Sequence, residues 1–568
     1  MAAISSGVAL PAESGRPQPD RSRVSTRTAS ALELSSRVSG GSGEGEPVRR
    51  PALQRANDPV QQACALDDDL LVRLWRGSFK GRSEELLWVP RYPNYHGGFY
   101  TPGHAGPWDY LQNVPLVLYG PKRIRASGAP LHRPAGIVDV YPTIGRLTRV
   151  DLAPRAGDVL RPALKPKVPG RPKLVVVVVW DGVGRNVLER WPNAWPTLRS
   201  LEARGTSFVD AMVGSSPSNT PPVHANLGTG TYPRVHGVTG IKQRVEFGDV
   251  VFALDGRETS TLRVSTFADQ IDQAFGGASE VGLVGFSSWQ LGMLGHGAGW
   301  PGGDEDHLAM LGEPGRVMGN GAYYDTPSYL REFPGFEAHA DAVDRSDGKA
   351  DGRWRGHPVL EDHDNPAWVR YENDVALTLV QQEGYGADDV TDILLVNYKM
   401  LDVIGHKYWI DSLEARDVLR AQDNALAQLV GYLKRKVRDF VVVVTADHGH
   451  TPPRTETGGW PVLATDASAY LNRHFEVPKG RSLVEDSSGA GLFLDVDVAK
   501  RLGITQREMA AALNLYTIRQ SAGKGRLPPM YKGRDREKVF AAVIPRRLLP
   551  QVMKCAFGTR RPPADFPA

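Results

Sequence analysis

Long continuous apolar runs mark the centre of the chain. Three of them, Leu174–Trp180, residues 393–398 and Phe440–Thr445, consist mostly of aliphatic and aromatic residues. Runs of this kind predict parallel strands that are covered on both faces, because a strand with one exposed face would alternate apolar and polar residues. The sequence therefore predicts a central, mainly parallel sheet.

A helix is expected between the last two of these strands. Residues 411–414, Asp-Ser-Leu-Glu, resemble a capping box at its start. Further along, apolar residues recur at helical spacing: Leu419, Leu426, Val430 and Leu433. A strand, a crossover helix and a second strand in this order are typical of an α/β fold, so we expect helices on both faces of the sheet.

The regions before this central part have a different character. Residues 1–66 are rich in Ser, Gly, Pro and Arg and lack the apolar core of a secretory signal, which indicates a disordered leader. Residues 67–163 contain an apolar run at 114–119 and helical spacing at 137–147, so we expect a compact segment. The prolines and the glycine of residues 164–172 predict a linker.

The main body is predicted to span residues 173–560. Within it, residues from about 295 to about 370 contain Gly, Asp, Trp and His with little periodicity. We interpret this stretch as an insertion that caps one edge of the sheet.

Carboxylates follow the three predicted strands. Asp181 comes directly after the first strand, Asp402 four residues beyond the second and Asp447 two residues beyond the third. Because ligands in open α/β sheets bind at the carboxyl ends of the strands, we expect the three side chains at one edge. Carboxylates this close either take up protons or surround cations. The accompanying His406 and His448 favour cations, since mixed oxygen and nitrogen ligands suit zinc or a similar divalent ion.

Thr220 is the candidate nucleophile. It precedes Pro221 and Pro222, and threonine is favoured as a helix N-cap while proline is favoured at the first helical position. A hydroxyl at a helix N-terminus lies beside backbone donors that can bind phosphate. A metal ion lowers the pKa of an oxygen that it binds, so a coordinated Thr220 could attack phosphorus. Two divalent ions would balance the three carboxylates and a Thr220 alkoxide.

Composition and charge exclude several classes of protein. The chain is 41% hydrophobic and 23% charged, which are ordinary values for a globular protein. Its net charge is only +4 and its cationic residues are interspersed with acidic ones, which argues against nucleic acid as a dedicated partner. No apolar stretch reaches the roughly 18 to 20 residues of a membrane-spanning helix. No export signal is visible, so we expect a cytoplasmic location by default and leave an extracytoplasmic one open. The sequence does not predict the oligomeric state.

These motifs resemble those of the alkaline phosphatase superfamily, most closely its type I phosphodiesterase and nucleotide pyrophosphatase branch. The matching stretches are residues 179–182, 217–230, 232–238, 402–406 and 445–449. The resemblance implies a small phosphoester substrate and two divalent metal ions, with zinc as the expected metal. It also implies the ligands: Asp181, Thr220, Asp447 and His448 for one ion, and Asp402, His406 and a further histidine for the other.

In the family, that further histidine lies downstream of the Asp-His-Gly motif. Here the matching context lies upstream, at His104 within residues 103–120, and is followed by a stretch that resembles the closing helix of the family. The chain therefore looks circularly permuted, with residues 67–163 equivalent to the C-terminal part of the fold. Such an order would bring Cys64 and Cys555 together and permit a disulfide, although we expect a pair of buried thiols.

Two departures from the family bear on the substrate. Relatives that cleave diesters often carry an asparagine shortly after a His-Gly-Ile motif, and residues 236–241 contain none. Monoesterases often carry a lysine and an arginine before a Gly-His motif, and residues 286–296 contain neither. The absence of this lysine and arginine favours a phosphodiesterase or nucleotide pyrophosphatase. Three alternative functions stay open: a phosphate monoesterase, a phosphonate hydrolase and a catalytically silent binding protein. An alternative domain arrangement also stays open, in which the N-terminal segment forms a separate domain and contributes nothing to the site.

For several polar residues the sequence leaves open whether they contact the metal or the substrate, or have a packing or solvated role. His450 and Lys399 are candidate substrate-binding residues, but His450 could instead support a metal ligand and Lys399 could be a solvated residue at a strand end. His224 and His236 are expected to pack rather than to bind metal. The acidic stretch Asp304–Asp306 and His307 look like metal ligands but are expected to be solvated.

Overall fold

The computed structural model describes residues 58–360, 364–523, 525 and 527–558. Residues 1–57 of the predicted leader and residues 361–363 of the predicted insertion lie outside the described residues. The leader prediction is wrong for residues 58–66, because they contain helix α1 (Pro59–Ala63), which Asp58 caps through the N–H of Val60 and whose Val60 and Ala63 are buried.

A large sheet forms the centre of the fold, in the strand order β12-β11-β10-β16-β5-β17-β3-β6, with β13 paired to β11. The predicted runs correspond to β5 (Leu174–Trp180), β16 (Asp392–Tyr398) and β17 (Phe440–Thr445). Both β16 and β17 run parallel to β5, which is buried along its whole length. The remaining strands are β3 (Leu116–Tyr119), β6 (Thr206–Phe208), β10 (Val281–Gly285), β11 (Asp306–Glu313), β12 (Arg316–Met318) and β13 (Tyr324–Asp325).

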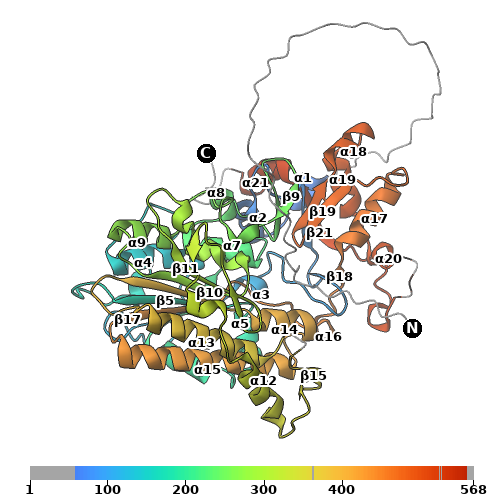
Figure 1. Ribbon diagram of the computed structural model, residues 1–568. Coiled ribbons are helices and arrows are strands. Elements are labelled where there is room, and N and C mark those ends of the chain that lie inside the picture. The colour runs from blue at the N-terminus through green and yellow to red at the C-terminus, as the bar shows by residue number, and fades with distance from the viewer. Residues whose placement is uncertain (1–57, 361–363, 524, 526, 559–568) are drawn as a thin grey trace, which may run out of the picture. The chain divides into compact units, whose positions relative to one another are not determined.

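Helices cover both faces of this sheet (Figure 1). One face carries α13 (Pro366–Gln382) and α15 (Leu413–Lys436), and the other carries α4 (Val140–Thr148), α7 (Thr220–Thr229) and α9 (Phe267–Phe275). The long helix α15 begins one residue later than the capping box predicted at residues 411–414: its N-cap is Ser412, whose hydroxyl accepts a hydrogen bond from the N–H of Ala415. The predicted α/β class, with a mainly parallel sheet and helices on both faces, is confirmed.

The segment before the predicted linker contributes a strand to the central sheet. β3 pairs antiparallel with β17 on one side and with β6 on the other, and Val117 lies opposite Val444. The segment is therefore not an independent domain. Residues 165–172 of the predicted linker contain neither helix nor strand and lead directly into β5.

A second, four-stranded antiparallel sheet was not predicted. Its order is β19-β20-β1-β21, formed by β19 (Val484–Ser488), β20 (Gly491–Leu494), β1 (Leu86–Pro90) and β21 (Phe540–Pro545). Helices α17 (Ala464–His474) and α19 (Gln506–Asn514) pack with it around a separate apolar core that includes Trp88, Met509 and Phe540. The prediction of one uniform body over residues 173–560 is wrong in this respect.

The predicted cap insertion is only partly an insertion. β11 pairs parallel with β10, so residues 306–313 extend the central sheet instead of covering its edge. The stretch that follows the edge strands forms α12 (Phe336–Asp344), which packs against α13 through Phe336 and Trp368, whose rings lie 4.6 Å apart. We therefore correct the prediction to an extended sheet edge followed by a small helical addition.

The two cysteines form a disulfide. Cys64 follows α1 and Cys555 lies in α21 (Leu549–Phe557), and their Cα atoms are 5.7 Å apart. The expectation of two buried thiols is wrong. The bond joins positions separated by 491 residues and so ties the beginning of the described chain to its end.

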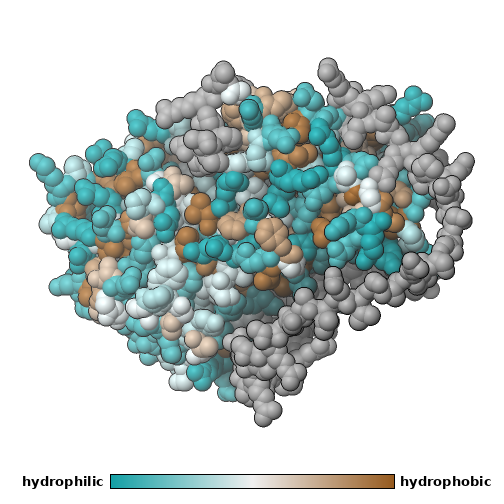
Figure 2. Space-filling model, turned by 90° about the horizontal axis from the view of Figure 1, so that it is seen from above, coloured by the Kyte–Doolittle hydropathy of each residue, from teal (hydrophilic) through white to brown (hydrophobic). Residues whose placement is uncertain are grey.

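The surface is of mixed polarity. On the face shown in Figure 2, hydrophilic and hydrophobic residues are interspersed. Exposed large apolar residues such as Val245, Phe247 and Phe252 do occur, as they do in most globular proteins. No helix within the described residues combines the length and the apolar character needed to span a membrane.

Candidate active site

The candidate site lies at the carboxyl edge of the central sheet. Asp181 directly follows β5, Asp402 lies in α14 (Met400–Tyr408) just after β16, and Asp447 follows β17. Because these three strands are parallel neighbours, the segments that leave them emerge side by side. All three carboxylates are buried.

Thr220 reaches the same edge from α7. It is the first residue of that helix, and Asn219 is the N-cap, so the structure moves the cap one residue before the predicted position. The Thr220 side chain is buried, and its Oγ1 accepts a hydrogen bond from Lys399 Nζ at 3.1 Å. The candidate nucleophile therefore lies next to the carboxylate cluster and not on the open surface.

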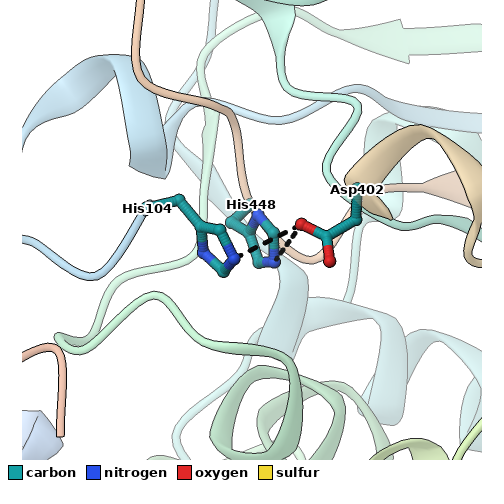
Figure 3. A group of neighbouring side chains, drawn as sticks. All are labelled: His104, Asp402 and His448. Carbon is teal, nitrogen blue, oxygen red and sulfur yellow. Dashed lines mark ion pairs between the residues drawn. The ribbon is translucent and has the colours of Figure 1, made fainter. Parts of the chain in front are cut away.

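His104 comes from the N-terminal segment and meets residues from the other half of the chain (Figure 3). Its Nε2 lies 3.3 Å from Asp402 Oδ1, and the Nε2 of His448 lies 4.0 Å from the same oxygen. The two imidazole rings are stacked, with centroids 3.6 Å apart. The second ring nitrogen of His104 fixes the orientation of the ring, because Nδ1 lies 3.0 Å from the backbone oxygen of Ser218.

Two more histidines point at the same carboxylate oxygen. His406 Nε2 lies 3.5 Å and His450 Nε2 lies 3.0 Å from Asp402 Oδ1. His406 is held by its Nδ1, which is 2.6 Å from the backbone oxygen of Pro102. His450 is packed tightly, since a Cβ atom on Gly405 would come within 2.6 Å of its ring.

Asp447 and His448 form the neighbouring part of the cluster. His448 Nε2 lies 3.1 Å from Asp447 Oδ2, and 3.7 Å from Asp181 Oδ1. The other oxygen of Asp447 accepts a hydrogen bond from the N–H of Gly182 at 3.0 Å. Gly182 has a φ of 75°, and a Cβ there would lie 3.0 Å from the Cα of Asp402, so glycine allows the loop after β5 to approach helix α14.

His224 lies beside this cluster in a positioning role. Its Nδ1 is 2.8 Å from the backbone oxygen of Thr220 and its Nε2 is 2.7 Å from Asn397 Oδ1. Asn397 in turn donates a hydrogen bond to Asp181 Oδ2 at 3.1 Å. Both ring nitrogens of His224 are thus engaged by the protein, in agreement with the expectation that it packs and orients its neighbours.

Lys399 lies inside the cluster. Its ammonium is 2.9 Å from Asp181 Oδ1 and 2.7 Å from Asp402 Oδ2, in addition to its hydrogen bond to Thr220. The side chain is only 7% exposed, so the interpretation of Lys399 as a solvated strand-end residue is wrong. Burial disfavours its charge, but the Asp181 and Asp402 carboxylates outweigh burial and raise the pKa of Lys399 above its usual range.

Burial also sets the protonation of the histidines. It is the largest cause that lowers the pKa of His104 and His450 to about 4 each, so these imidazoles are neutral at pH 7 and can donate a lone pair. Loss of solvation also lowers the pKa of His406 to about 4, although its side chain is 39% exposed. His448 differs: burial opposes its charge, but Asp447 raises the pKa of His448 to about 9. Burial, followed by repulsion from Asp447, raises the pKa of Asp181 to about 8.

Sequence reasoning missed two asparagines of the site. Asn397 is the polar residue within the apolar run of β16, which is a signal that could have been used. Asn219 directly precedes Thr220 and is 2% exposed; its Nδ2 makes no hydrogen bond to any part of the chain that the structure describes. Nothing in the sequence distinguishes this asparagine from an ordinary helix cap.

Comparison with known proteins gives a consistent result. The sequence model of the type I phosphodiesterase / nucleotide pyrophosphatase family matches residues 175–494, which is more than half of the 568-residue chain. The alkaline phosphatase PhoV of Synechococcus elongatus is 21% identical over 434 residues, covering 64% of this chain and 74% of PhoV. The alkaline phosphatase PafA of Elizabethkingia meningoseptica is 38% identical over 66 residues, covering 11% of this chain and 12% of PafA.

Among solved structures, wild-type alkaline phosphatase PafA aligns with a TM-score of 0.49 at 17% identity, over 66% of this chain and 84% of that one. The family match covers the segments that carry Asp181, Thr220, Asp402 and Asp447, whereas His104 lies outside it. The chain belongs to the type I phosphodiesterase / nucleotide pyrophosphatase family within the alkaline phosphatase superfamily, and it is an enzyme that acts on phosphoric esters.

Proposed function

We propose that the enzyme hydrolyses phosphoric diesters or pyrophosphate bonds of small molecules, with Thr220 as the nucleophile and two divalent metal ions, expected to be zinc. The observation that carries this proposal is the position of the buried Thr220 hydroxyl beside carboxylates and imidazoles that converge from both halves of the chain. The proposed substrate class is more specific than the family assignment, and it depends on the residues around Thr220.

The residues fit metal ions. Within the described residues, four buried atoms lie at ion-pair distance from one another and have no hydrogen-bond partner outside their own group: Asp402 Oδ1, Asp447 Oδ2, His448 Nε2 and His450 Nε2. Each buried polar atom left without a hydrogen bond costs about 1–3 kcal/mol, so a group of four is not expected unless it serves a ligand. Mixed carboxylate and imidazole donors match the preferences of zinc.

The family resemblance and this geometry support the following ligand sets. Asp181, Thr220, Asp447 and His448 would hold one ion, and Asp402, His406 and His104 the other. Such ions neutralise charge on the phosphoryl oxygens and lower the pKa of an oxygen that they bind. His450, whose Nε2 lies closer to Asp402 Oδ1 than that of His104, is a further ligand or a contact to the substrate.

The chain's own residues perform the nucleophilic step. Thr220 Oγ1 gives up its proton to solvent and forms a new bond to phosphorus, while the ester oxygen of the leaving group takes the electrons of the bond that breaks and a proton from solvent. Water then cleaves the phosphothreonine and regenerates the hydroxyl. The Lys399 ammonium donates to Thr220 Oγ1 and so favours its deprotonated, nucleophilic form. Hence Lys399 is a catalytic residue in this proposal.

Asn219 is the proposed donor to a phosphoryl oxygen. Pro221 and Pro222 carry no backbone N–H, so the first turn of α7 offers the substrate only the N–H of Thr220. The unpaired Nδ2 of Asn219, adjacent in sequence to the nucleophile, can supply a second donor. This asparagine would replace the one that diester-cleaving relatives carry after their His-Gly-Ile motif.

A phosphate monoesterase is the second candidate function. The absence of a Lys and Arg pair in residues 286–296 favoured a diester, but Lys399 supplies a buried cation at the nucleophile from a different position. A dianionic monoester benefits more from such a cation than a diester does. PhoV and PafA, both named as alkaline phosphatases, support this candidate.

Two substrates separate the candidates. The ratio of kcat/KM for bis-p-nitrophenyl phosphate to that for p-nitrophenyl phosphate should exceed one, and a ratio far below one would replace the diesterase proposal by the monoesterase. Thr220→Ala should abolish both activities. Thr229→Ala, which removes a hydroxyl at the other end of the same helix, serves as the matched control. Unchanged turnover in Thr220→Ala would mean that the activity comes from another site.

We also infer that the chain is circularly permuted, with residues 67–163 equivalent to the C-terminal part of the fold. The inference is supported by the family match, which begins at residue 175, and by the contact between His104 and Asp402. The pairing of β3 with β17 supports it as well. In this arrangement the N-terminal segment supplies β3 to the central sheet and His104 to the site.

A further inference from the structure

A second group of carboxylates lies away from the active site. Asp272 is near the end of α9, Asp304 lies in the loop before β11, and Asp306 is the first residue of β11. Because β10 and β11 run in the same direction as β16 and β5, the start of β11 lies at the opposite edge of the sheet from Asp181 and Asp402. The expectation that this acidic stretch is solvated is wrong for Asp306, which is 5% exposed.

The three carboxylates are close together and lack a counter-charge. One oxygen from each lies within 4.8 Å of the other two. In the part of the chain that the structure describes, no lysine, arginine or histidine forms an ion pair with any of them. The nearby Asp269 is already satisfied by His296 Nδ1 at 3.0 Å and by the N–H of Thr266 at 2.7 Å.

An unpaired buried atom points independently to a ligand. Asp272 is 2% exposed, and its Oδ1 makes no hydrogen bond with any described residue. Asp272 also lies in the last turn of α9, where the helix dipole presents its negative end and disfavours a carboxylate. Burial, followed by repulsion from Asp304, raises the pKa of Asp272 to about 7, and burial together with Asp269 raises the pKa of Asp306 as well.

We propose that Asp272, Asp304 and Asp306 form a structural binding site for a hard divalent cation such as Ca²⁺. Ca²⁺ binds oxygens at roughly 2.3–2.6 Å, so ligand oxygens on one ion can be up to about 5 Å apart, and the observed 4.8 Å limit fits. The donors are carboxylates without imidazole, which distinguishes this site from the mixed donors of the active site.

Such an ion would connect two parts of the sheet edge. Asp272 belongs to a helix on one face of the sheet, whereas Asp304 and Asp306 begin the strand β11 that extends the sheet. The cation would fix the glycine-rich loop before β11 against α9 and would remove the repulsion among the three carboxylates. Its role is therefore stability and not catalysis.

The test is Ca²⁺ binding to the zinc-loaded full chain, measured by calorimetry and by thermal unfolding. Ca²⁺ should raise the Tm by on the order of 2 °C at saturation. Asp306→Asn and Asp304→Asn should each lower the Ca²⁺ affinity at least tenfold. Asp304 is exposed, so its variant does not disturb the core.

Two control variants test whether Ca²⁺ binds at this carboxylate group. Glu305→Gln removes the same charge from the exposed residue between the two aspartates, which is not part of the cluster, and should keep the Ca²⁺ response. Asp402→Asn, in the active site, should also keep it. The proposal would be overturned if Ca²⁺ did not raise the Tm of the wild-type protein, or if the rise in Tm survived in Asp306→Asn. In that case the carboxyl groups share a proton.

Discussion

Lys399 holds a buried positive charge between two carboxylates and the proposed nucleophile. Lysine is rarely buried without such partners, and here the ammonium contacts Asp181, Asp402 and Thr220 at 2.7–3.1 Å. The residue therefore contributes both to the balance of charge in the site and to the state of the Thr220 hydroxyl. These two contributions can be separated by experiment.

Lys399→Met should lower kcat by about a hundredfold, the size of effect seen when one donor that stabilises a developing oxyanion is removed. Metal content should be retained, because the variant makes the site more negative and so no less attractive to cations. Steady-state kinetics and metal analysis of the same preparation check both points. Lys407→Met is the control, because Lys407 lies in helix α14, which Lys399 precedes as the N-cap, and is paired with Asp364. An unchanged kcat in Lys399→Met would contradict the assigned role.

Asn219→Ala tests the proposed contact to a phosphoryl oxygen. We expect kcat/KM to fall by about ten- to a hundredfold, because a donor to the charged oxygen is lost while the metal ligands remain. The half-buried Asn320, whose side chain bonds to backbone groups of residues 256, 257 and 322, provides the control Asn320→Ala. If both variants keep the parent's kcat/KM, the unpaired amide has no part in catalysis.

At the scale of elements, the sequence predicts the strands that carry the site well. β5, β16 and β17 are buried on both faces, so their runs are continuous and unmistakable. The carboxylates that follow them could be located for the same reason. The direction of the Lys399 side chain could not be predicted, because it depends on charges contributed by Asp181 and Asp402 through different strands.

The second sheet could not be predicted from local pattern. β1 pairs with β21, where Leu87 lies opposite Ile544, and with β20, where Leu86 lies opposite Leu492. Residues this far apart in the chain give no periodic signal that reveals their pairing. The edge strands β12 and β13 are two or three residues long, too short for an apolar pattern to register.

Helix α14 approaches the site through Gly405. A Cβ atom at this position would come within 2.6 Å of the His450 ring, which is itself 3.0 Å from Asp402. Gly405→Ala should therefore displace His450, lower kcat by at least tenfold and weaken metal binding, although alanine favours the helix itself. Gly431→Ala in α15, where the nearest atom is the end of the flexible Arg435 side chain, should leave activity unchanged. Equal activity of the two variants would show that His450 tolerates the displacement.

At the scale of the whole molecule, the two ends of the described chain meet. The Cys64–Cys555 disulfide holds Cα atoms 5.7 Å apart, and β1 and β21 pair beside it. The beginning and the end of the described chain can therefore be joined by a short loop, while residues 165–172, without helix or strand, offer a place for new termini.

A reordered chain tests the permutation. Residues 173–558 followed by a flexible linker of about ten residues and then by residues 58–164 should fold, bind metal and retain most of the parent's kcat, because every contact of the site is preserved. Residues 173–558 alone should lose one metal ion and most activity. If the reordered chain folds but does not bind two ions, the N-terminal segment is not equivalent to a C-terminal part of the fold.

The most direct measurement is the metal content of His104→Ala. His104 is the only proposed ligand from the N-terminal segment, and its Nε2 lies 3.3 Å from Asp402 Oδ1. We predict two divalent ions per chain in the parent protein and one in His104→Ala, with two retained in His132→Ala, which changes an exposed histidine of the same segment. A folded His104→Ala protein that still binds two ions with the parent's affinity would contradict the claim that both halves of the chain build the metal centre.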